Sequence, residues 1–293
     1  MSKYIRLIRP TNWIKNLLVF GALLFAGRWF DLIALYSSLL TFTAFCALAS
    51  SLYVINDWID RERDRQHPAK SDRPLASGEI GGSQAILLGF VLLFICVVCL
   101  SLLPTTVRLN TLFVLAIYAS IMLAYNAGVK HQPGLDVIIV AGGFLLRALA
   151  GGVAINVPVT SWFVISVFFL SLTVVSGKRR SELVILGDQG SARHRPVMEY
   201  YSEPLMDVLI AISAGSALVT YSLWTVTSRT AQQHSPSWMP ISILFVVYGL
   251  FRFLYHVYVT GEAKKPERIF YKDPYMALNI LAWAGVVAFL LTI

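Results

Sequence analysis

The sequence predicts an all-α membrane protein, built as a bundle of nine transmembrane helices in one domain over residues 1–293. The first observation is composition: 57% of the residues are hydrophobic, only 14% are charged, and the mean hydropathy is +0.67. Soluble domains carry about a quarter charged residues, so this composition is typical of a membrane protein. The second observation is pattern, because the apolar residues form long blocks separated by short charged stretches.

Each apolar block is long enough to form a membrane span. A helix needs about 20 predominantly apolar residues to cross roughly 30 Å of hydrocarbon. Nine runs meet this expectation, in chain order 14–30, 32–55, 83–103, 108–126, 135–155, 161–177, 205–226, 238–259 and 275–293. The first run is the least well defined, because Arg28 and Asp31 crowd its end. Barrel strands are excluded, since the runs are too long and too uniformly apolar.

Charge is distributed unequally over the connecting loops. With the N-terminus placed in the cytoplasm, most of the 24 Lys and Arg residues fall in cytoplasmic segments, so the positive-inside rule predicts that orientation. Nine spans then place the C-terminus outside.

Of the 16 acidic residues only Asp31 lies outside, and six acids fall between Asp57 and Glu79. Topology does not demand acids there, so we expect the chemistry at the cytoplasmic face of a bacterial-type plasma membrane. The basic residues are dispersed over several loops, which gives no support for nucleic-acid binding.

The segment after the second span carries the acids. If the helix continues, Asp57, Asp60 and Asp64 recur at i, i+3 and i+7 and stack on one face over two turns. Carboxylates this close repel one another unless a hard cation intervenes. Mg²⁺ is typically held by one or two carboxylates together with phosphate oxygens and water. We therefore predict that the three aspartates are catalytic metal ligands. The alternative is a solvated charged turn, neutralised by the arginines interspersed among the acids.

The next segment adds cations between prolines. Residues 67–78 read His-Pro-Ala-Lys-Ser-Asp-Arg-Pro-Leu-Ala-Ser-Gly, and the prolines exclude a simple helix. Lys70 and Arg73 are cations suited to phosphate oxygens. Carboxylates for a metal followed by cations for phosphate predict a diphosphate site over residues 56–78.

Together the two segments read NDxxDxxxDxxHPxKxxRPxxxG, which resembles the first Asp-rich motif of the UbiA superfamily of intramembrane prenyltransferases. The resemblance extends over essentially the whole chain and includes the nine spans. It implies a UbiA-like fold in which this loop binds a substrate diphosphate through Mg²⁺ on the cytoplasmic side. On this resemblance Asn56 joins the three aspartates in that role, and Lys70 and Arg73 are phosphate partners.

The region after the sixth span departs from the aromatic prenyltransferases of that superfamily. Those enzymes carry a second acidic motif there, roughly DxxxD, whereas this chain reads Lys178-Arg179-Arg180-Ser181-Glu182. With residues 9–16, residues 125–131 together with Asp136, and residues 146–152, this departure resembles a branch that transfers 5-phosphoribose from phosphoribosyl pyrophosphate (PRPP) to a polyprenyl phosphate such as decaprenyl phosphate. The resemblance implies a Mg²⁺-dependent pentosyl transferase that releases pyrophosphate.

That activity gives each polar group an expected role. Mg²⁺ on the Asp57 face would neutralise the diphosphate leaving group. The 5-phosphate needs a separate cationic cradle, for which the supply is Lys178, Arg179 and Arg180. The acceptor phosphate is already ionised, so no strong general base is required. Lys15, or Lys130 with His131, could hold that acceptor near the membrane surface.

Three further ionisable residues are candidate substrate-binding groups. Asp136 and Arg147 are eleven residues apart, about three helical turns, and so share one face of the fifth span. An arginine inside a span is costly, so Arg147 either pairs with a polar neighbour as a structural residue or faces the substrate. Glu182 is at i+4 from Lys178 and could do no more than orient that cation.

Two other functions are alternatives. The first keeps the fold but moves a polyprenyl group from its diphosphate to an aromatic or other acceptor, which should require carboxylates at the second motif. The second is a transporter or channel whose polar loop is a gate. Transporters place their sites near the bilayer midplane, whereas the acids here cluster at one face.

Overall fold

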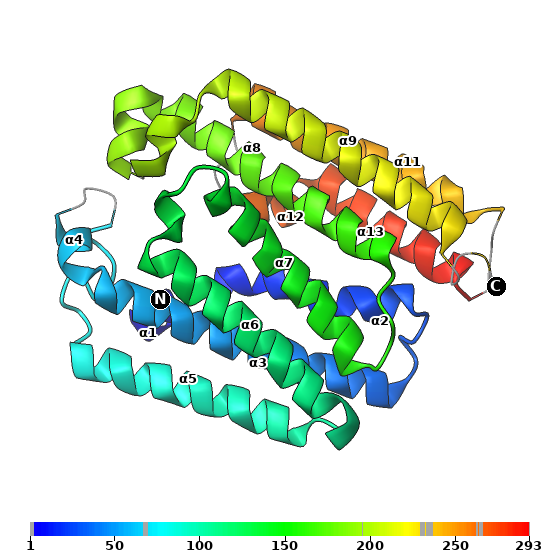
Figure 1. Ribbon diagram of the computed structural model, residues 1–293, viewed down its shortest axis with the longest axis horizontal. Coiled ribbons are helices and arrows are strands. Elements are labelled where there is room, and N and C mark those ends of the chain that lie inside the picture. Colours follow the sequence, from blue (N-terminus) through cyan, green and yellow to red (C-terminus); the bar gives the residue numbers. More distant parts are fainter. Residues whose placement is uncertain are drawn as a thin grey trace.

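The computed structural model describes residues 3–66, 70–194, 196–228, 232, 237–261, 263 and 266–292. Throughout these residues the regular structure is helical, which confirms the predicted all-α class (Figure 1). Seven helical segments in this part of the chain are long and apolar enough to cross a membrane, and each coincides with a predicted span. They are α3 (Leu32–Ile59), α5 (Gly82–Leu102), α6 (Thr105–Ala127), α7 (Leu135–Ala154), the first part of α8 (Ser161–His194), α9 (Glu203–Thr227), and the run formed by η4 (Met239–Ser242), α11 (Ile243–Tyr255) and η5 (His256–Thr260).

The first and last predicted spans take other forms. The first is divided into η1 (Pro10–Phe20), a 3-10 helix of 11 residues, and the short α2 (Gly21–Phe25). The last is α13 (Pro274–Leu290), with 17 residues. The count of nine spans is therefore not confirmed. At about 2.0 Å per residue in a 3-10 helix and about 1.5 Å in an α-helix, η1 with α2 covers roughly 30 Å and α13 roughly 25 Å.

A glycine in α7 explains how η1 fits into the bundle. The carbonyl oxygen of Val19 lies 1.9 Å from the position that a Cβ on Gly151 would occupy. Only glycine permits this approach, so η1 lies directly against the backbone of α7, and it also packs along α3. Asn16 and Val19 of η1 are buried as a result.

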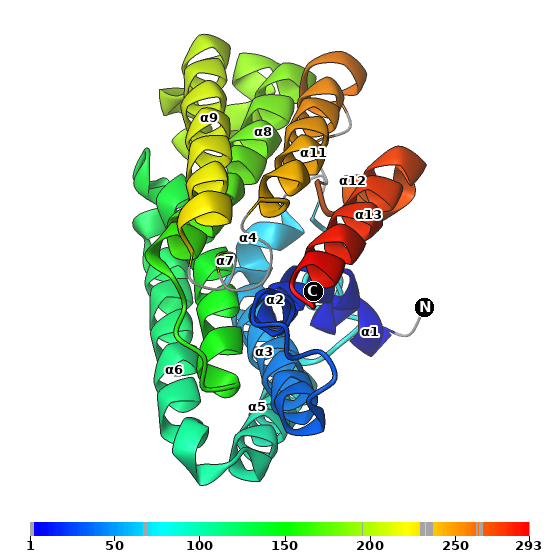
Figure 2. The same cartoon turned by 90° about the vertical axis from the view of Figure 1, so that its right-hand side faces the viewer.

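The long helices pack side by side around these elements. α8 packs along α9, α3 packs along α5, and α7 lies between α6 and α8 (Figure 2). The largest buried apolar cluster joins α3, α5, α6, α7 and η1, and includes Phe45, Leu115 and Ala150. Large apolar side chains such as Phe90 and Phe94 on the outer face of α5 are exposed, as expected for a surface that contacts lipid.

The charged connections gather at one end of the bundle. In Figure 1 this is the left-hand end, where α3 continues into α4 (Arg61–Arg65), α6 turns into α7 through η2 (Val129–His131), and α8 turns into α9 through η3 (Pro196–Tyr200). The opposite end carries the α5–α6 hairpin and the C-terminus. Predicted site residues from the first two of these connections therefore lie at the same end of the molecule.

Candidate active site

The acidic motif lies where α3 ends. Asp60 is the C-cap of α3, and helix-like hydrogen bonds continue through it, from Asp60 N to Asn56 O (2.9 Å) and from Asp64 N to Asp60 O (2.8 Å). This path places Asp57 and Asp64 on the inner side of the turn, where they are 2% and 3% exposed. Asn56 and Asp60 are only partly buried, at the rim of the same turn.

Two arginines neutralise the buried carboxylates. Arg73 Nη1 lies 3.1 Å from Asp57 Oδ1 and 2.6 Å from Asp64 Oδ2. Arg9 Nη2 donates to both oxygens of Asp57, at 2.6 and 2.7 Å. Buried carboxylates need such partners because loss of hydration penalises an unpaired charge. Both arginine side chains are about a quarter exposed, so the acids are covered by groups that still contact solvent.

The two buried carboxylates fit a divalent metal ion. Oxygens of Asp57 and Asp64 face one guanidinium nitrogen, so they already converge on a single positive centre. Mg²⁺ needs only one or two carboxylates when phosphate oxygens and water complete its shell. Across the described ranges, no three His, Cys, Asp or Glu side chains come together as a cluster. The three-aspartate ligand set stays a prediction, and the geometry favours two aspartates with substrate oxygens.

The loop after α4 folds back over these acids. Backbone hydrogen bonds from Arg73 N to Lys70 O (3.0 Å) and from Ser77 N to Arg73 O (2.8 Å) hold its turns. Arg73 is thereby fixed above the carboxylates, and Lys70 is partly buried three residues earlier. His67, which belongs to the predicted motif, lies outside the described residues.

The predicted acceptor-binding groups lie on η1 and η2. Lys130 and His131 belong to η2, and Lys130 Nζ is 3.6 Å from Asp60 Oδ2. This contact joins η2 to the end of α3, so Lys130 lies beside the acidic motif. Lys15 is partly buried on η1, the element that directly follows Arg9.

A second polar group is buried between α7, α8 and η3. Arg179 Nε lies 3.3 Å from Asp136 Oδ2, and its Nη1 lies 3.1 Å from Glu182 Oε2. Tyr201 donates its hydroxyl to the other oxygen of Asp136. Asp136 has no exposed surface, and Arg179 is 3% exposed. Lys178 Nζ is 4.0 Å from Glu182 Oε1, and the lysine is the most exposed member of the group at 34%.

Arg180 faces a different side of α8. Its guanidinium lies 2.5 Å from Asp207 and 3.7 Å from Glu203, and its carbon is 4.2 Å from the ring centre of Tyr258. Successive residues on a helix are about 100° apart, so three consecutive cations cannot share one face. The predicted Lys178-Arg179-Arg180 cradle is therefore divided, and Arg180 forms a contact to α9 and η5.

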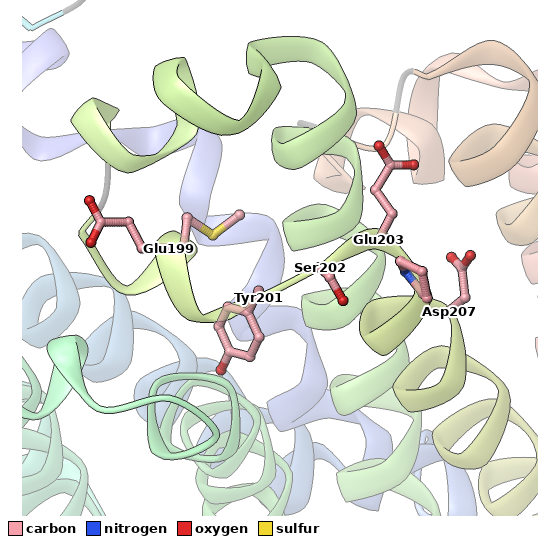
Figure 3. A pocket seen from close by; sticks show the side chains of 7 residues that line it. Glu199, Tyr201, Ser202, Glu203 and Asp207 are labelled. Carbon is pink, nitrogen blue, oxygen red and sulfur yellow. The ribbon is translucent and has the colours of Figure 1, made fainter.

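An open pocket of about 760 Å³ lies beside these contacts. Figure 3 shows its lining from η3 and the first turns of α9, with labels on Glu199, Tyr201, Ser202, Glu203 and Asp207. Its charged lining is acidic, which is unsuited to a phosphate. The ring of Tyr201 points away from the carboxylates of Glu203 and Asp207. The pocket therefore borders the second polar group without sharing its cations.

Arg147 is held in the bundle interior by three donated hydrogen bonds. They reach Asn16 Oδ1 (2.6 Å), Gly143 O (2.6 Å) and Tyr118 OH (2.7 Å). The guanidinium carbon also lies 4.7 Å from the ring centre of Tyr118. Because each of its three nitrogens has a protein acceptor, the geometry supports the structural alternative, in which Arg147 ties η1 and α6 to α7.

A further ion cluster joins α11 and η5 to the start of α13. Arg252 Nε lies 2.7 Å from Asp273 Oδ2, and His256 Nε2 contacts the same oxygen. Burial alone would raise the pKa of Asp273, but hydrogen bonds from Arg252, His256 and the amides of the first turn of α13 outweigh it and hold that pKa well below its usual range. Asp273 is also the N-cap of α13, so the cluster fixes the start of that helix.

Two residues of the site were not predicted from the sequence. Arg9 reaches Asp57 across 48 residues, and Tyr201 reaches Asp136 across 65 residues. The only local signal for Arg9 is its place in the stretch of residues 9–16, where the predicted binding residue is Lys15. No spacing rule relates Tyr201 to α7, because the contact depends on how η3 folds back.

Comparison with known proteins places the chain in a family. A model of the UbiA prenyltransferase family matches residues 17–281, which is most of the sequence. The chain belongs to that family. Among solved structures, a UbiA homolog from Archaeoglobus fulgidus bound to GPP and Mg²⁺ superimposes with a TM-score of 0.70 over 100% of both chains, at 20% identity. That likeness shows the UbiA fold and confirms the predicted fold family.

Curated members of the UbiA family include more similar sequences. The decaprenyl-phosphate phosphoribosyltransferase of Mycolicibacterium smegmatis is 35% identical over 98% of this chain and 92% of its own length. The protein of the same name from Mycobacterium tuberculosis is 33% identical over 97% of this chain and 92% of its own length. With its apolar helices, the chain is thus a multi-pass membrane transferase of the UbiA family.

Proposed function

We propose that this UbiA family member transfers 5-phosphoribose from PRPP to a polyprenyl phosphate such as decaprenyl phosphate and releases pyrophosphate. The observation that carries the proposal is the second polar group. At this group Arg179 pairs with Asp136 and Glu182, and the more exposed Lys178 adds a second cation, so the group offers positive charge suited to a phosphate. Near-full-length similarity to two enzymes named decaprenyl-phosphate phosphoribosyltransferase supports the same activity.

The acidic motif is the proposed diphosphate end of the site. Asp57 and Asp64 would hold Mg²⁺, with Asn56 and Asp60 at the rim to contact its water or the diphosphate. When bound, Mg²⁺ supplies positive charge that neutralises the departing pyrophosphate. Arg73 is bonded to the same two carboxylates. With an ion at those oxygens, the guanidinium of Arg73 would be available to bind the diphosphate. Lys70, in the same loop, would provide a second cation for the diphosphate.

The transfer step needs orientation and charge stabilisation more than proton transfer. An oxygen of the polyprenyl phosphate attacks C1 of the ribose while the bond from C1 to the pyrophosphate oxygen breaks, and the electron pair leaves with pyrophosphate. The attacking oxygen is already ionised, so no general base is required. Lys178, positioned by Glu182 and Arg179, would bind the 5-phosphate and fix the ribose for in-line attack.

The acceptor lipid is proposed to reach the site from the membrane surface. Lys130 lies beside Asp60, His131 follows it on η2, and Lys15 lies on η1, the element that follows Arg9. One or more of them would hold the acceptor phosphate while its isoprenoid tail stays in lipid.

We also propose the orientation of the chain. The polar end that carries α4, η2 and η3 would face the cytoplasm of a bacterial cell, because the connections at that end carry most of the Lys and Arg residues. The lengths of η1 with α2 and of α13 are compatible with two further crossings, which would give nine spans in one domain and place the C-terminus outside.

The test is a reconstituted reaction. Purified protein is incubated with PRPP, Mg²⁺ and a polyprenyl phosphate, and both lipid-linked phosphoribose and pyrophosphate are measured. Formation of the two in equal amounts supports the proposal. If neither product forms, and the protein instead forms product from a polyprenyl diphosphate and an aromatic acceptor, the prenyl transfer alternative is established.

A further inference from the structure

Tyr201 stands between elements that carry both polar groups of the site. Its hydroxyl accepts a hydrogen bond from Gly134 N (2.6 Å) and donates one to Asp136 Oδ1. The other oxygen of Asp136 lies 3.3 Å from Arg179 Nε. A single hydroxyl therefore fixes the turn before α7 and, through one carboxylate, the buried guanidinium on α8. In Figure 3 the ring of Tyr201, which also lines the acidic pocket, points away from the carboxylates of Glu203 and Asp207.

The same turn extends to the acidic motif. Gly134 ends the connection that begins with η2, and Lys130 in η2 lies 3.6 Å from Asp60. Gly134 has φ of +79°, a conformation that glycine adopts without strain and other residues rarely do. The connection between α6 and α7 is thus held at one end by Lys130 and Asp60 and at the other by Tyr201.

Burial makes this hydroxyl difficult to replace. Tyr201 is 8% exposed, and Asp136 has no exposed surface. Burial and then the hydrogen bond to Asp136 raise the pKa of Tyr201, so the hydroxyl remains a donor at neutral pH. Without it, a carboxylate oxygen and a backbone amide would each lose a partner in a place with little access to water.

We propose that Tyr201 is a positioning residue that holds Asp136, and through it Arg179, in the arrangement that binds the 5-phosphoribosyl part of PRPP. Tyr201 acts through Asp136 and the turn before α7 and does not itself contact substrate. The inference rests on the proposed phosphoribosyl transfer. It assigns a role in substrate affinity to the segment between η3 and α9, outside both motifs.

Tyr201→Phe tests the inference because it removes only the hydroxyl. Tyr221→Phe is the matched control: Tyr221 is also buried, and its hydroxyl bonds with Ser242 Oγ (2.8 Å) and accepts from Trp283 Nε1 (2.9 Å), but in an apolar cluster. Initial rates are measured with PRPP and polyprenyl phosphate varied separately, together with the thermal unfolding midpoint. We expect Tyr201→Phe to raise the KM for PRPP about tenfold, equivalent to about 1.4 kcal/mol. The KM for polyprenyl phosphate should change less than twofold, and Tyr221→Phe should alter only the midpoint.

A second measurement tests the route of the effect. If Tyr201 acts through Arg179, the double variant Tyr201→Phe with Arg179→Lys should have a KM for PRPP no higher than Arg179→Lys alone. Additive increases would overturn the inference. Asp136→Asn retains the shape of the side chain and should raise the KM for PRPP as Tyr201→Phe does. This variant supplies the test if Tyr201→Phe does not fold.

The outcomes separate this inference from the proposed function. A wild-type protein that forms no lipid-linked phosphoribose would reject the function itself. The other outcome is an active wild type and a Tyr201→Phe variant that loses thermal stability, as Tyr221→Phe does, but keeps its KM for PRPP. That result would overturn only the positioning role.

Discussion

Arg73 Nη1 lies 2.6 Å from Asp64 Oδ2, at the point where the carboxylates of Asp64 and Asp57 converge. The guanidinium therefore stands where a divalent ion would find two ligands. On the proposed function, Arg73 and Mg²⁺ would compete for the same oxygens. With metal and PRPP bound, the two carboxylates would hold the metal, and Arg73 would be available to contact the phosphate.

This exchange predicts that loss of Arg73 strengthens metal binding and weakens PRPP binding. In Arg73→Met, Mn²⁺ added as a paramagnetic substitute for Mg²⁺ should bind about tenfold more tightly in the absence of PRPP, because Asp64 then loses its arginine partner and Asp57 keeps only Arg9. The KM for PRPP should rise, because a phosphate partner is lost. Electron paramagnetic resonance of free Mn²⁺ measures the first effect, and weaker Mn²⁺ binding would show that Arg73 does not compete with the metal. Arg65→Met, at an exposed neighbouring arginine, is the control.

The division of the cationic triplet predicts unequal roles for neighbouring residues. Lys178→Ala should raise the KM for PRPP about tenfold with little change in kcat, because a binding charge is lost. Arg180→Met should leave that KM within about twofold and lower thermal stability instead, because its partners are Asp207 and Glu203 on α9. Steady-state kinetics with PRPP as the varied substrate checks both. A larger KM effect from Arg180→Met than from Lys178→Ala would place the 5-phosphate on the other side of α8.

The three acceptors of Arg147 predict a stability phenotype. Arg147→Lys cannot reach Asn16, Gly143 and Tyr118 together, so buried acceptors lose partners at a cost of about 2 kcal/mol. At roughly 2–4 °C per kcal/mol, the midpoint of thermal unfolding in detergent should fall by about 5 °C. The KM values of the folded fraction should not change. An unaltered midpoint with a changed KM would mean that Arg147 contacts substrate.

The close approach of η1 to α7 predicts intolerance of a single methyl group. Gly151→Ala places a Cβ 1.9 Å from the carbonyl oxygen of Val19, so η1 must move, and we expect loss of folded protein or a markedly lower unfolding midpoint. Gly142→Ala in the same helix is the control, because nothing lies within 4 Å of its Cβ position. That variant should be neutral or slightly stabilising. Equal yields and midpoints for the two variants would contradict the packing described for η1.

Much of the fold was predictable because a membrane span is a local property of the sequence. Seven predicted spans coincide with long apolar helices, since length and apolar content decide them. The form of the first run was not predictable, because η1 and α2 depend on the space that Gly151 leaves in α7. The same limit applies to α13, whose start is fixed by Asp273 and its partners Arg252 on α11 and His256 on η5.

The site was predictable where residues share a helix and not where the chain folds back. Helical spacing brings Asp57 and Asp64 to one side of the turn. The same spacing directs Lys178 and Arg180 to different sides of α8, so the predicted cationic triplet is divided. The pairing of Arg9 with Asp57 depends on the path of the N-terminal segment across α3. The contact of Tyr201 with Asp136 depends on the turn from α8 into α9.

The central claim is that Asp57 and Asp64 hold the metal that serves PRPP, with the lipid as acceptor. The most direct measurement follows lipid-linked phosphoribose and pyrophosphate together in wild type, Asp57→Asn, Asp64→Asn and the exposed control Glu62→Gln. We predict equal amounts of the two products in wild type and in Glu62→Gln. Each aspartate variant should lose at least about a hundredfold in rate, the scale for removal of one charge-stabilising group, while its unfolding midpoint shows that it is folded. Undiminished, Mg²⁺-dependent product formation in both aspartate variants would contradict the claim.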